Sequence, residues 1–299
     1  MGAFAGCADS APADGAAEDG TNTVARPYAL VIGVDGVRAD ALVAADTPNL
    51  DRIRDAGAWS MSAQTQQEAA TNSGPGWASI LTGVDADKHN IWENDQYDGQ
   101  DPDYPSFLWR ARDAGLRTMT SINWIPLSTA IVEDDAVDER VLGTDTHVTD
   151  ELAARLTAGD YDVHFIHFDD VDHAGHASGF NPDNDAYTDA IEVVDRQVGQ
   201  LLDAIEARAS WADESWLIAM TSDHGGTDAG HGCLTWECRT VPLILSGPAF
   251  ERGELLEAGS HMDVHPTVLQ HMGLTPSQDW DLDGAVQGLP QGTESGGAE

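Results

Sequence analysis

The histidines and several aspartates of this 299-residue chain gather in a few short segments. Asp172 and His176 form an Asp-x-x-x-His set, and Asp223, His224 and His231 form a second set. Carboxylate and imidazole together suit zinc or manganese, because calcium prefers oxygen ligands alone. One Asp-His pair would be expected by chance in so acidic a chain, but two mixed sets favour a metal site.

A candidate nucleophile lies in residues 71–77, Thr-Asn-Ser-Gly-Pro-Gly-Trp. The Gly and Pro residues predict a tight turn, and an apolar helix is expected to begin near Pro75. A hydroxyl at a helix N-terminus lies where the helix dipole favours an oxyanion or a bound phosphate. A neighbouring metal ion would lower the pKa of that hydroxyl. Taken alone, the segment is better interpreted as an ordinary capped turn.

The predicted elements explain how segments so far apart could meet. Continuous apolar runs predict buried strands, and apolar periodicity with terminal Thr, Pro and Gly signals predicts helices. The strands are expected at 28–34, 116–122, 163–168, 215–220 and 241–245, and the helices at 47–57, 104–114, 146–158, 183–209 and 263–271. Strands that alternate with helices predict an α/β fold, with a mostly parallel sheet and helices on both faces.

In such folds, ligands bind beyond the carboxyl ends of the strands. Asp35 follows the strand at 28–34, Asp172 follows the strand at 163–168, and Asp223 follows the strand at 215–220. We therefore expect three separate strand ends to converge on one crevice, with Asp35 as a further metal ligand.

The ends of the chain differ in composition from its middle. Residues 1–26 and 284–299 are rich in small and polar residues without periodicity, which predicts a disordered N-terminal arm and a disordered C-terminal tail. Residues 27–283 are then one folded domain, as their length allows. No apolar run approaches the roughly 20 residues that span a bilayer.

The charge of the chain excludes one class of function. Acidic residues number 52 against 14 basic ones, for a net charge of −38, and such a field repels nucleic acid. The acids are 37 Asp and 15 Glu, and Lys88 is the single lysine. This balance is typical of a halophile's protein, whose self-repulsion is screened by salt. A calcium-loaded acidic surface protein is the alternative.

The cysteines indicate whether the protein is exported or cytoplasmic. Phe4-Ala-Gly-Cys7 resembles the lipobox of bacterial lipoproteins, in which the Cys is lipidated, so we expect an exported protein with a possible lipid anchor at Cys7. A chance Cys in an Ala/Gly-rich tail is the alternative, and a cytoplasmic location stays open. Cys233 and Cys238 would pair in an exported protein and would be two free thiols in a cytoplasmic one.

In their order along the chain, these residues resemble the alkaline phosphatase superfamily, and most of all its type I phosphodiesterase/nucleotide pyrophosphatase branch. The resemblance runs from about Tyr28 to Gly273. The matching segments are Val-Ile-Gly-Val-Asp35-Gly-Val-Arg, Ser73 to Gly83, Lys88-His-Asn-Ile with Asn94, Thr-Ser-Asp223-His-Gly-Gly, Gly-His231-Gly, Val241-Pro-Leu-Ile-Leu and Asp263-Val-His-Pro-Thr-Val-Leu.

The resemblance implies an alkaline phosphatase-like three-layer sandwich with two divalent metal ions, zinc or manganese. One metal would be held by Asp35, Ser73, Asp223 and His224, and the other by Asp172, His176 and His231. The family's spacing to the following Thr-Gly selects Ser73 over Thr71 as the nucleophile, which would form a phospho-seryl intermediate. Asn72, Asn94 and Lys88 are expected to contact a small-molecule phosphoester, most naturally a phosphodiester or a nucleotide-type substrate.

Four other functions remain open. A phosphomonoesterase differs from a phosphodiesterase only in how the phosphate is held, and here Gly76 replaces an Asn of the phosphodiesterase branch. A sulfatase would carry Arg where Trp77 stands. A cofactor-independent mutase needs a large inserted domain, for which the segment between Ser73 and Asp172 leaves little room. The alternative of another class is an acidic metal-binding surface protein without catalysis.

Overall fold

The computed structural model describes residues 25–97, 100–255 and 259–289. In these ranges eight strands form one sheet in the order β4-β3-β5-β1-β6-β7-β2-β8. The strands are β1 (Arg26–Val34), β2 (Gly57–Gln64), β3 (Thr118–Ile122), β4 (Glu139–Leu142), β5 (Val163–Phe168), β6 (Glu214–Thr221), β7 (Thr240–Ser246) and β8 (Gly253–Glu254). Strand β7 runs antiparallel to both of its neighbours, and the other neighbouring pairs are parallel.

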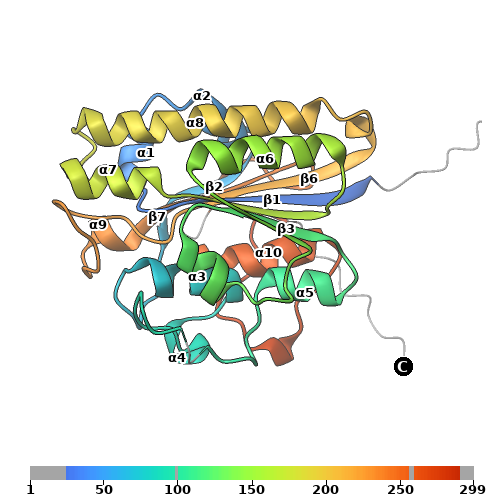
Figure 1. Ribbon diagram of the computed structural model, residues 1–299, viewed down its shortest axis with the longest axis horizontal. Helices are drawn as coiled ribbons and strands as arrows, with labels where there is room; N and C mark the ends of the chain where they lie inside the picture. Colours follow the sequence, from blue (N-terminus) through green and yellow to red (C-terminus); the bar gives the residue numbers. More distant parts are fainter. Residues whose placement is uncertain (1–24, 98–99, 256–258, 290–299) are drawn as a thin grey trace, which may run out of the picture.

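Helices cover both faces of the sheet, as Figure 1 shows. One layer holds α1 (Ala39–Ala44), α2 (Pro48–Ala56), α6 (Asp145–Ala158), α7 (Asp170–Ser178) and α8 (Asp185–Glu206). The opposite layer holds α3 (Ser73–Thr82), α4 (Ala86–His89), α5 (Phe107–Asp113) and α10 (Val264–His271), and α9 (Trp236–Arg239) lies beside β7. A π-helical turn (Leu127–Ile131) and 3-10 turns (Trp211–Asp213, His261–Asp263, Gln278–Trp280) complete the described elements.

The apolar residues divide into two core clusters, one on each face of the sheet. In β1, Leu30 and Ile32 pack with the first helical layer, whereas Ala29 and Val31 pack with the second. A strand buried on both faces reads as a continuous apolar run, which is why residues 28–34 were recognisable as a central parallel strand. The predicted three-layer α/β fold with a mostly parallel sheet is confirmed.

The predicted domain limits need two adjustments. The predicted arm ends at residue 26, but Arg26 already belongs to β1. The predicted tail begins at residue 284, whereas Gly284 donates to the Gly83 carbonyl and Ala285 donates to Asp263. Residues 1–24, with the proposed lipobox at Cys7, and residues 290–299 lie outside the described residues. Within the described ranges, none of the helices combines the length and the apolar character that a membrane span requires.

Candidate metal centre

The three predicted strand ends lie at one edge of the sheet. Strand β1 pairs with β5 on one side and with β6 on the other, and Val34 lies opposite Phe168. The backbone N–H of Asp35 donates to the Phe168 carbonyl over 2.9 Å, which holds the two strand ends level. Asp35 therefore lies between the start of α7, which carries Asp172, and the Asp223-His224 pair that follows β6.

Asp35, Asp223 and His224 form a first cluster of donor atoms, here called the Asp35 group. The His224 Nε2 atom lies 3.5 Å from Asp35 Oδ1 and 3.3 Å from Asp223 Oδ2. The Ser73 hydroxyl oxygen lies 3.3 Å from the same nitrogen. All three members of the group are buried. The four residues that the resemblance assigned to one metal are therefore together.

The set that the resemblance assigned to the other metal, Asp172, His176 and His231, is here called the Asp172 group. Asp172 and His231 form a cluster of donor atoms together with His224, and His176 lies beside Asp172. Asp172 Oδ2 lies 3.4 Å from His176 Nε2, and Asp172 Oδ1 lies 4.0 Å from His231 Nε2. The rings of His224 and His231 stack with centroids 3.9 Å apart, so the two groups adjoin. The backbone at Gly36 lies against Asp172, and a Cβ at that position would lie 2.8 Å from Asp172 Oδ1. Gly36 also has a φ of +70°, which glycine adopts readily, so a glycine is needed next to Asp35.

The three histidines of the two groups share one hydrogen-bond arrangement. His224 Nδ1 lies 2.8 Å from the Gly225 carbonyl, His176 Nδ1 lies 3.0 Å from the Ala229 carbonyl, and His231 Nδ1 lies 3.0 Å from the Thr71 carbonyl. A carbonyl only accepts, so each Nδ1 must carry the proton and donate it. Nε2, the other ring nitrogen, then faces the cluster and is the atom with which each imidazole could bind a metal, as in metal-binding histidines.

The carboxylates of both groups fit divalent cations. Asp35 Oδ1, Asp172 Oδ1 and Asp223 Oδ2 are buried oxygen atoms without a hydrogen-bond partner. Burial and neighbouring carboxylates raise the pKa of Asp35 to about 7 and that of Asp172 to about 6, and burial raises the pKa of Asp223 well above its ordinary value. Such uncompensated acceptors are costly without a cation. Two Asp/His groups with imidazole nitrogens aimed inward suit zinc or manganese.

The structure separates the two hydroxyl candidates. Ser73 is the first residue of α3 and is 7% exposed, with its hydroxyl at the Asp35 group. The Thr71 hydroxyl instead donates to the Cys233 carbonyl over 2.9 Å. Position 76 requires a glycine, because the Cβ of any other residue would lie 2.8 Å from the Asp223 carbonyl oxygen. Helix α3 packs directly on the segment that carries Asp223.

Of the three predicted substrate-binding residues, two flank Ser73. Asn94 Oδ1 accepts a hydrogen bond from the Gly74 N–H over 2.7 Å, and Asn72 donates to the Glu93 carboxylate over 3.2 Å. Lys88 does not join them. Its ammonium group donates to the Asp281 carbonyl and to the Asp283 carboxylate, both over 2.7 Å, which ties α4 to the C-terminal segment.

Two side chains outside the expected set of site residues also contact Asp35. Trp77 Nε1 donates to Asp35 Oδ2 over 2.9 Å, and His167 Nε2 lies 3.2 Å from the same oxygen. Both side chains are fully buried. A histidine within the apolar run of β5 was the available signal for His167. The signal for Trp77 was its place in a segment expected to border the crevice, although an aromatic residue at a helical position is ordinarily core.

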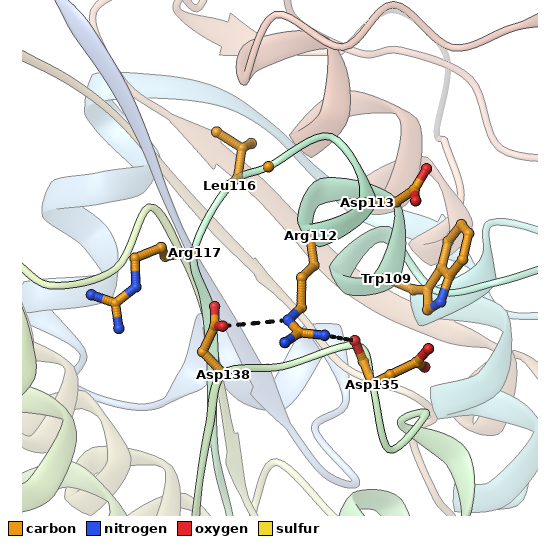
Figure 2. Close-up of a pocket in the computed structure, with 8 residues that line it drawn as sticks. Trp109, Arg112, Asp113, Leu116, Arg117, Asp135 and Asp138 are labelled. Atoms are coloured by element: carbon orange, nitrogen blue, oxygen red, sulfur yellow. Dashed lines mark hydrogen bonds and ion pairs between the residues drawn. The ribbon is translucent and has the colours of Figure 1, made fainter.

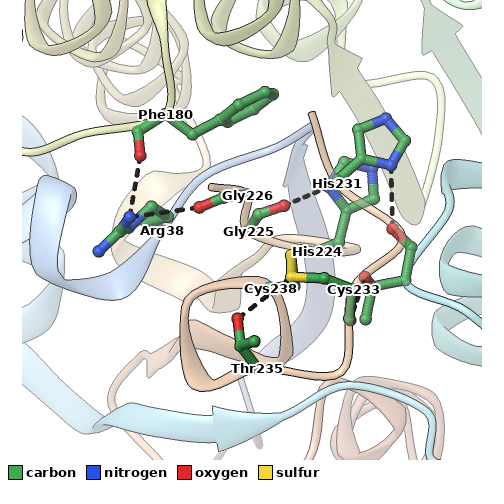
Figure 3. The surroundings of a disulfide bond; sticks show 10 residues. Arg38, Phe180, His224, Gly225, Gly226, His231, Cys233, Thr235 and Cys238 are labelled. Atoms are coloured by element: carbon green, nitrogen blue, oxygen red, sulfur yellow. Dashed lines mark hydrogen bonds between the residues drawn. A yellow bond between two sulfur atoms is a disulfide. The ribbon is translucent and has the colours of Figure 1, made fainter. Parts of the chain in front are cut away.

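Cys233 and Cys238 form a disulfide bond close to the two groups (Figure 3). The Cys238 carbonyl accepts from the Gly225 N–H over 2.9 Å, and the Cys233 carbonyl accepts from the Thr71 hydroxyl. The disulfide loop is thereby bonded both to the segment after His224 and to the segment before Ser73. The pairing expected of an exported protein is present.

A separate surface cavity of about 460 Å³ lies away from this centre (Figure 2). Its walls include Gly115, Leu116 and Arg117, which precede β3 and so lie at the opposite edge of the sheet. Within the cavity, Arg112 is already paired with Asp138 and with the Asp135 carbonyl. The cavity contains none of the predicted site residues.

Comparison with known families agrees with this geometry. A family model described as the Metalloenzyme superfamily matches residues 34–276. The chain belongs to the Metalloenzyme superfamily. This alkaline phosphatase-like superfamily comprises enzymes that transfer phosphoryl or sulfuryl groups with the help of divalent metal ions. The recognition made from the sequence is thus confirmed at the level of the superfamily.

Curated proteins match this chain over part of their own length. A 2,3-bisphosphoglycerate-independent phosphoglycerate mutase of Myxococcus xanthus is 33% identical over 145 residues, which are 46% of this chain and 26% of the mutase. The catalytic subunit of human GPI ethanolamine phosphate transferase 2 is 30% identical over 109 residues, 36% of this chain and 11% of the transferase. The matched segments span about a quarter or less of these relatives.

Solved structures share the fold at low sequence identity. Murine ectonucleotide pyrophosphatase/phosphodiesterase 5, in complex with AMP, has a TM-score of 0.68 at 16% identity, and the match covers 84% of this chain and 96% of that one. The phosphonate monoester hydrolase of Agrobacterium radiobacter has a TM-score of 0.67 at 18% identity, with 89% and 78% covered. A 2-O GAG sulfatase has a TM-score of 0.71 at 13% identity, with 88% and 73% covered.

Proposed function

We propose that this member of the Metalloenzyme superfamily is a two-metal phosphoester hydrolase that prefers phosphodiesters, including nucleotide-type substrates. The observation that carries the proposal is the position of the Ser73 hydroxyl. It lies 3.3 Å from His224 Nε2, at the N-terminus of the buried helix α3 and beside two adjoining Asp/His groups. A hydroxyl so placed is a nucleophile rather than a helix cap.

The Asp35 group with Ser73 would hold one divalent cation, and the Asp172 group would hold the other. When bound, such ions lower the pKa of a hydroxyl or a water molecule and neutralise phosphoryl oxygens. Zinc or manganese fits this donor set.

The reaction of this chain's own residues follows from the geometry. Ser73 Oγ loses its proton and attacks phosphorus in line with the departing ester oxygen, so that the Oγ–P bond forms as the ester bond breaks. The departing oxygen takes up one proton and leaves as the alcohol. Water then cleaves the phosphoserine and releases the second product. The positive end of α3 favours the anionic phosphoryl group during both steps. Asn94 supports this geometry, because its hydrogen bond to the Gly74 N–H fixes the first turn of α3.

The charges around Ser73 favour a diester, which brings one negative charge, over a monoester dianion, which brings two. Arg38 and Lys88 are the cations that the sequence places nearest to the site. Arg38 is bound to Asp40 and to the Phe180 and Gly226 carbonyls, as Figure 3 shows in part, and Lys88 is bound to the C-terminal segment. Neither is free to hold an additional phosphate oxygen.

The alternatives are less well supported. Trp77 stands where a sulfatase would carry Arg, and its indole N–H is committed to Asp35. The likeness to a sulfatase and to a phosphonate hydrolase is one of fold. The mutase match covers only 26% of the mutase. The segment between Ser73 and Asp172 leaves little room for the inserted domain that a mutase needs. A metal-binding protein without catalysis would not need a hydroxyl beside the cations.

The test is the ratio of kcat/KM for bis-p-nitrophenyl phosphate to that for p-nitrophenyl phosphate, at matched molar salt and with zinc or manganese. We expect a ratio above one, with an aryl sulfate turned over far more slowly than either. A ratio well below one would make the protein a phosphomonoesterase. Two metal ions per chain without turnover of any ester would support the non-catalytic alternative.

We also propose that the protein is exported. The Cys233–Cys238 disulfide supports export, because disulfides persist in oxidising compartments. Mass spectrometry of the native N-terminal peptide tests this. Lipidation at Cys7 or its removal with a leader is expected, and an intact unmodified Cys7 would contradict export through the lipobox.

A further inference from the structure

We propose that Trp77 and His167 are positioning residues that orient the Asp35 carboxylate for metal binding. The inference rests on the metal assignment of the proposed function and goes beyond its ligand set. Trp77 Nε1 and His167 Nε2 both contact Asp35 Oδ2, at 2.9 Å and 3.2 Å. The other oxygen, Oδ1, has no hydrogen-bond partner and lies 3.5 Å from His224 Nε2. The two contacts thus fix which oxygen of Asp35 is presented to the cluster.

The indole of Trp77 is held where it is by close packing. Trp77 is fully buried, and its ring meets the rings of Phe165 and His167 edge-on, at centroid distances of 6.0 Å and 4.8 Å. Gly33 in β1 leaves room for it, because a Cβ at that position would lie 2.5 Å from the indole. The ring therefore has no space in which to turn its N–H away from Asp35.

The hydrogen bonds of His167 distinguish it from the histidines of the two groups. The Trp124 backbone N–H donates to His167 Nδ1, with an N···N distance of 3.5 Å. Because Nδ1 accepts this hydrogen bond, the ring proton of His167 is on Nε2. His224, His176 and His231 hold their protons on Nδ1 against carbonyl groups. His167 therefore donates to Asp35 through Nε2, whereas in the other three histidines Nε2 is the atom that could bind a metal.

A carboxylate held in one orientation is expected to bind a metal ion more tightly than one that rotates. A ligating carboxylate that can rotate must be ordered when the metal binds, and loss of an outer hydrogen bond typically costs about 10–100-fold in affinity or activity. Two donors from different elements, α3 and β5, act on the same oxygen of Asp35. Each is expected to contribute part of this preorganisation.

The decisive experiment compares Trp77→Phe with Trp216→Phe. Trp216 is also buried, and its indole donates to the Glu214 carboxylate over 2.7 Å, at the opposite end of β6 from the cluster. Both variants lose one indole–carboxylate hydrogen bond and a similar volume. Zn²⁺ affinity is measured by competition with a chromophoric chelator, and the visible absorption spectrum is recorded after substitution with Co²⁺.

We expect Trp77→Phe to weaken one of the two metal sites by about 10–100-fold and to change the Co²⁺ spectrum. Trp216→Phe should leave both affinities within about twofold and the spectrum unchanged, even where it lowers stability as much. Unchanged Zn²⁺ affinities and an unchanged Co²⁺ spectrum in Trp77→Phe would overturn the proposal.

A second pair of variants keeps the proposal testable if Trp77→Phe does not fold. His167→Gln retains an N–H donor toward Asp35, whereas His167→Leu does not. We expect near wild-type affinity in the first and a weakened site in the second. Asp35, His167 and Asp169 also form a group of donor atoms that could hold an ion, in which His167 would be a ligand. Equal affinities, or one fewer bound metal ion in His167→Leu than in the wild type, would overturn the positioning role. Metal affinity needs no substrate, so a protein inactive on every ester would contradict the proposed function without deciding this test.

Discussion

At the scale of single residues, two buried carboxylates share one pattern: one oxygen accepts hydrogen bonds from the protein, and the other has no hydrogen-bond partner. Asp35 uses Oδ2 for hydrogen bonds within the protein and leaves Oδ1 beside His224 Nε2. Asp223 accepts from the Gly36 N–H with Oδ1 and leaves Oδ2 beside the same nitrogen. In each carboxylate, hydrogen bonds from the chain hold one oxygen and leave the other directed at His224 Nε2, as expected of a metal ligand with outer-sphere support.

Ser73→Ala is expected to abolish turnover and to preserve metal binding. Loss of a covalent nucleophile typically lowers kcat by several powers of ten, and the Asp and His side chains of both groups remain. Steady-state kinetics and metal analysis of the purified variant measure both effects.

The matched control for this variant is Ser79→Ala. Ser79 lies in the same helix, is buried, and pairs its hydroxyl with His89 Nε2 over 2.9 Å, away from the cluster. This variant should lose some stability and keep its activity. If Ser73→Ala stays active while Thr71→Ala does not, Thr71 is the nucleophile.

Metal removal should have an effect that depends on pH. In the metal-free protein, burial raises the pKa of Asp35 from 3.8 to about 7 and that of Asp172 from 3.8 to about 6. The folded state then binds more protons than the unfolded state between about pH 4 and 7, so these groups destabilise the metal-free protein as pH rises through that window. The metal-loaded protein escapes this cost, because its carboxylates are ionised and neutralised.

The gap in melting temperature between metal-loaded and chelator-treated protein should therefore widen from about pH 5 to pH 7.5. His231 does not titrate in this range, because burial and its histidine neighbours lower its pKa to about 3. A gap that is constant with pH would show that the carboxylates are already ionised without metal.

At the scale of elements, the disulfide loop and helix α3 position the centre together. The His231 ring donates to the Thr71 carbonyl, and the Gly232 N–H donates to the same atom over 3.0 Å. The Cys233–Cys238 bond closes the chain directly after this contact. The loop therefore links the Asp172 group to the residues that lead into α3.

Replacing both cysteines by Ser should loosen the loop that carries His231. So short a closed loop predicts a loss of about 2 kcal/mol in the free energy of unfolding on the chain-entropy estimate. Zn²⁺ affinity should fall at the Asp172 group and hold at the Asp35 group. Chemical unfolding and chelator competition measure the two effects. If both affinities are unchanged, the disulfide contributes stability alone.

The sequence predicted the elements that have strong local patterns. The apolar runs of β1, β5 and β6 and the long periodic face of α8 were recognisable, and so was the convergence of their carboxyl ends. Strand β2 was missed, because Gly-Ala-Trp-Ser-Met-Ser-Ala-Gln lacks the β-branched residues typical of strands. The reversed direction of β7 depends on its neighbours in the sheet, which local sequence does not reveal.

Within the site, motif order predicted which Asp and His side chains lie together, whereas their outer contacts could not be predicted. The Asp35 contacts of Trp77 and His167 join α3 and β5 to the end of β1. Such contacts depend on how two layers stack, and no spacing along the chain encodes them. The partners of Lys88 could not be predicted for a related reason, since Asp281 and Asp283 lie almost 200 residues away in the sequence.

At the scale of the whole molecule, the net charge of −38 should make stability depend on salt. Unscreened repulsion opposes the compact state, and the Debye length shrinks from about 10 Å at 0.1 M to about 3 Å at 1 M. We expect the melting temperature to climb steeply between dilute buffer and molar KCl. Sucrose is the control, because it favours compact states by exclusion without screening charge. A melting temperature that does not change with salt would remove the halophile interpretation.

The place of β2 in the sheet sets the order in which the protein can be completed during synthesis. Strand β2 (Gly57–Gln64) pairs only with β7 (Thr240–Ser246) and β8 (Gly253–Glu254) among the described strands. At ribosomal rates of about 5–20 residues per second, the intervening stretch of about 180 residues takes roughly 10–35 s to make. A nascent chain therefore carries Asp35 and Ser73 early but holds β2 unpaired until β7 emerges. Ribosome-bound chains that end before β7 should expose this strand to chaperones, and chains that end after β8 should not.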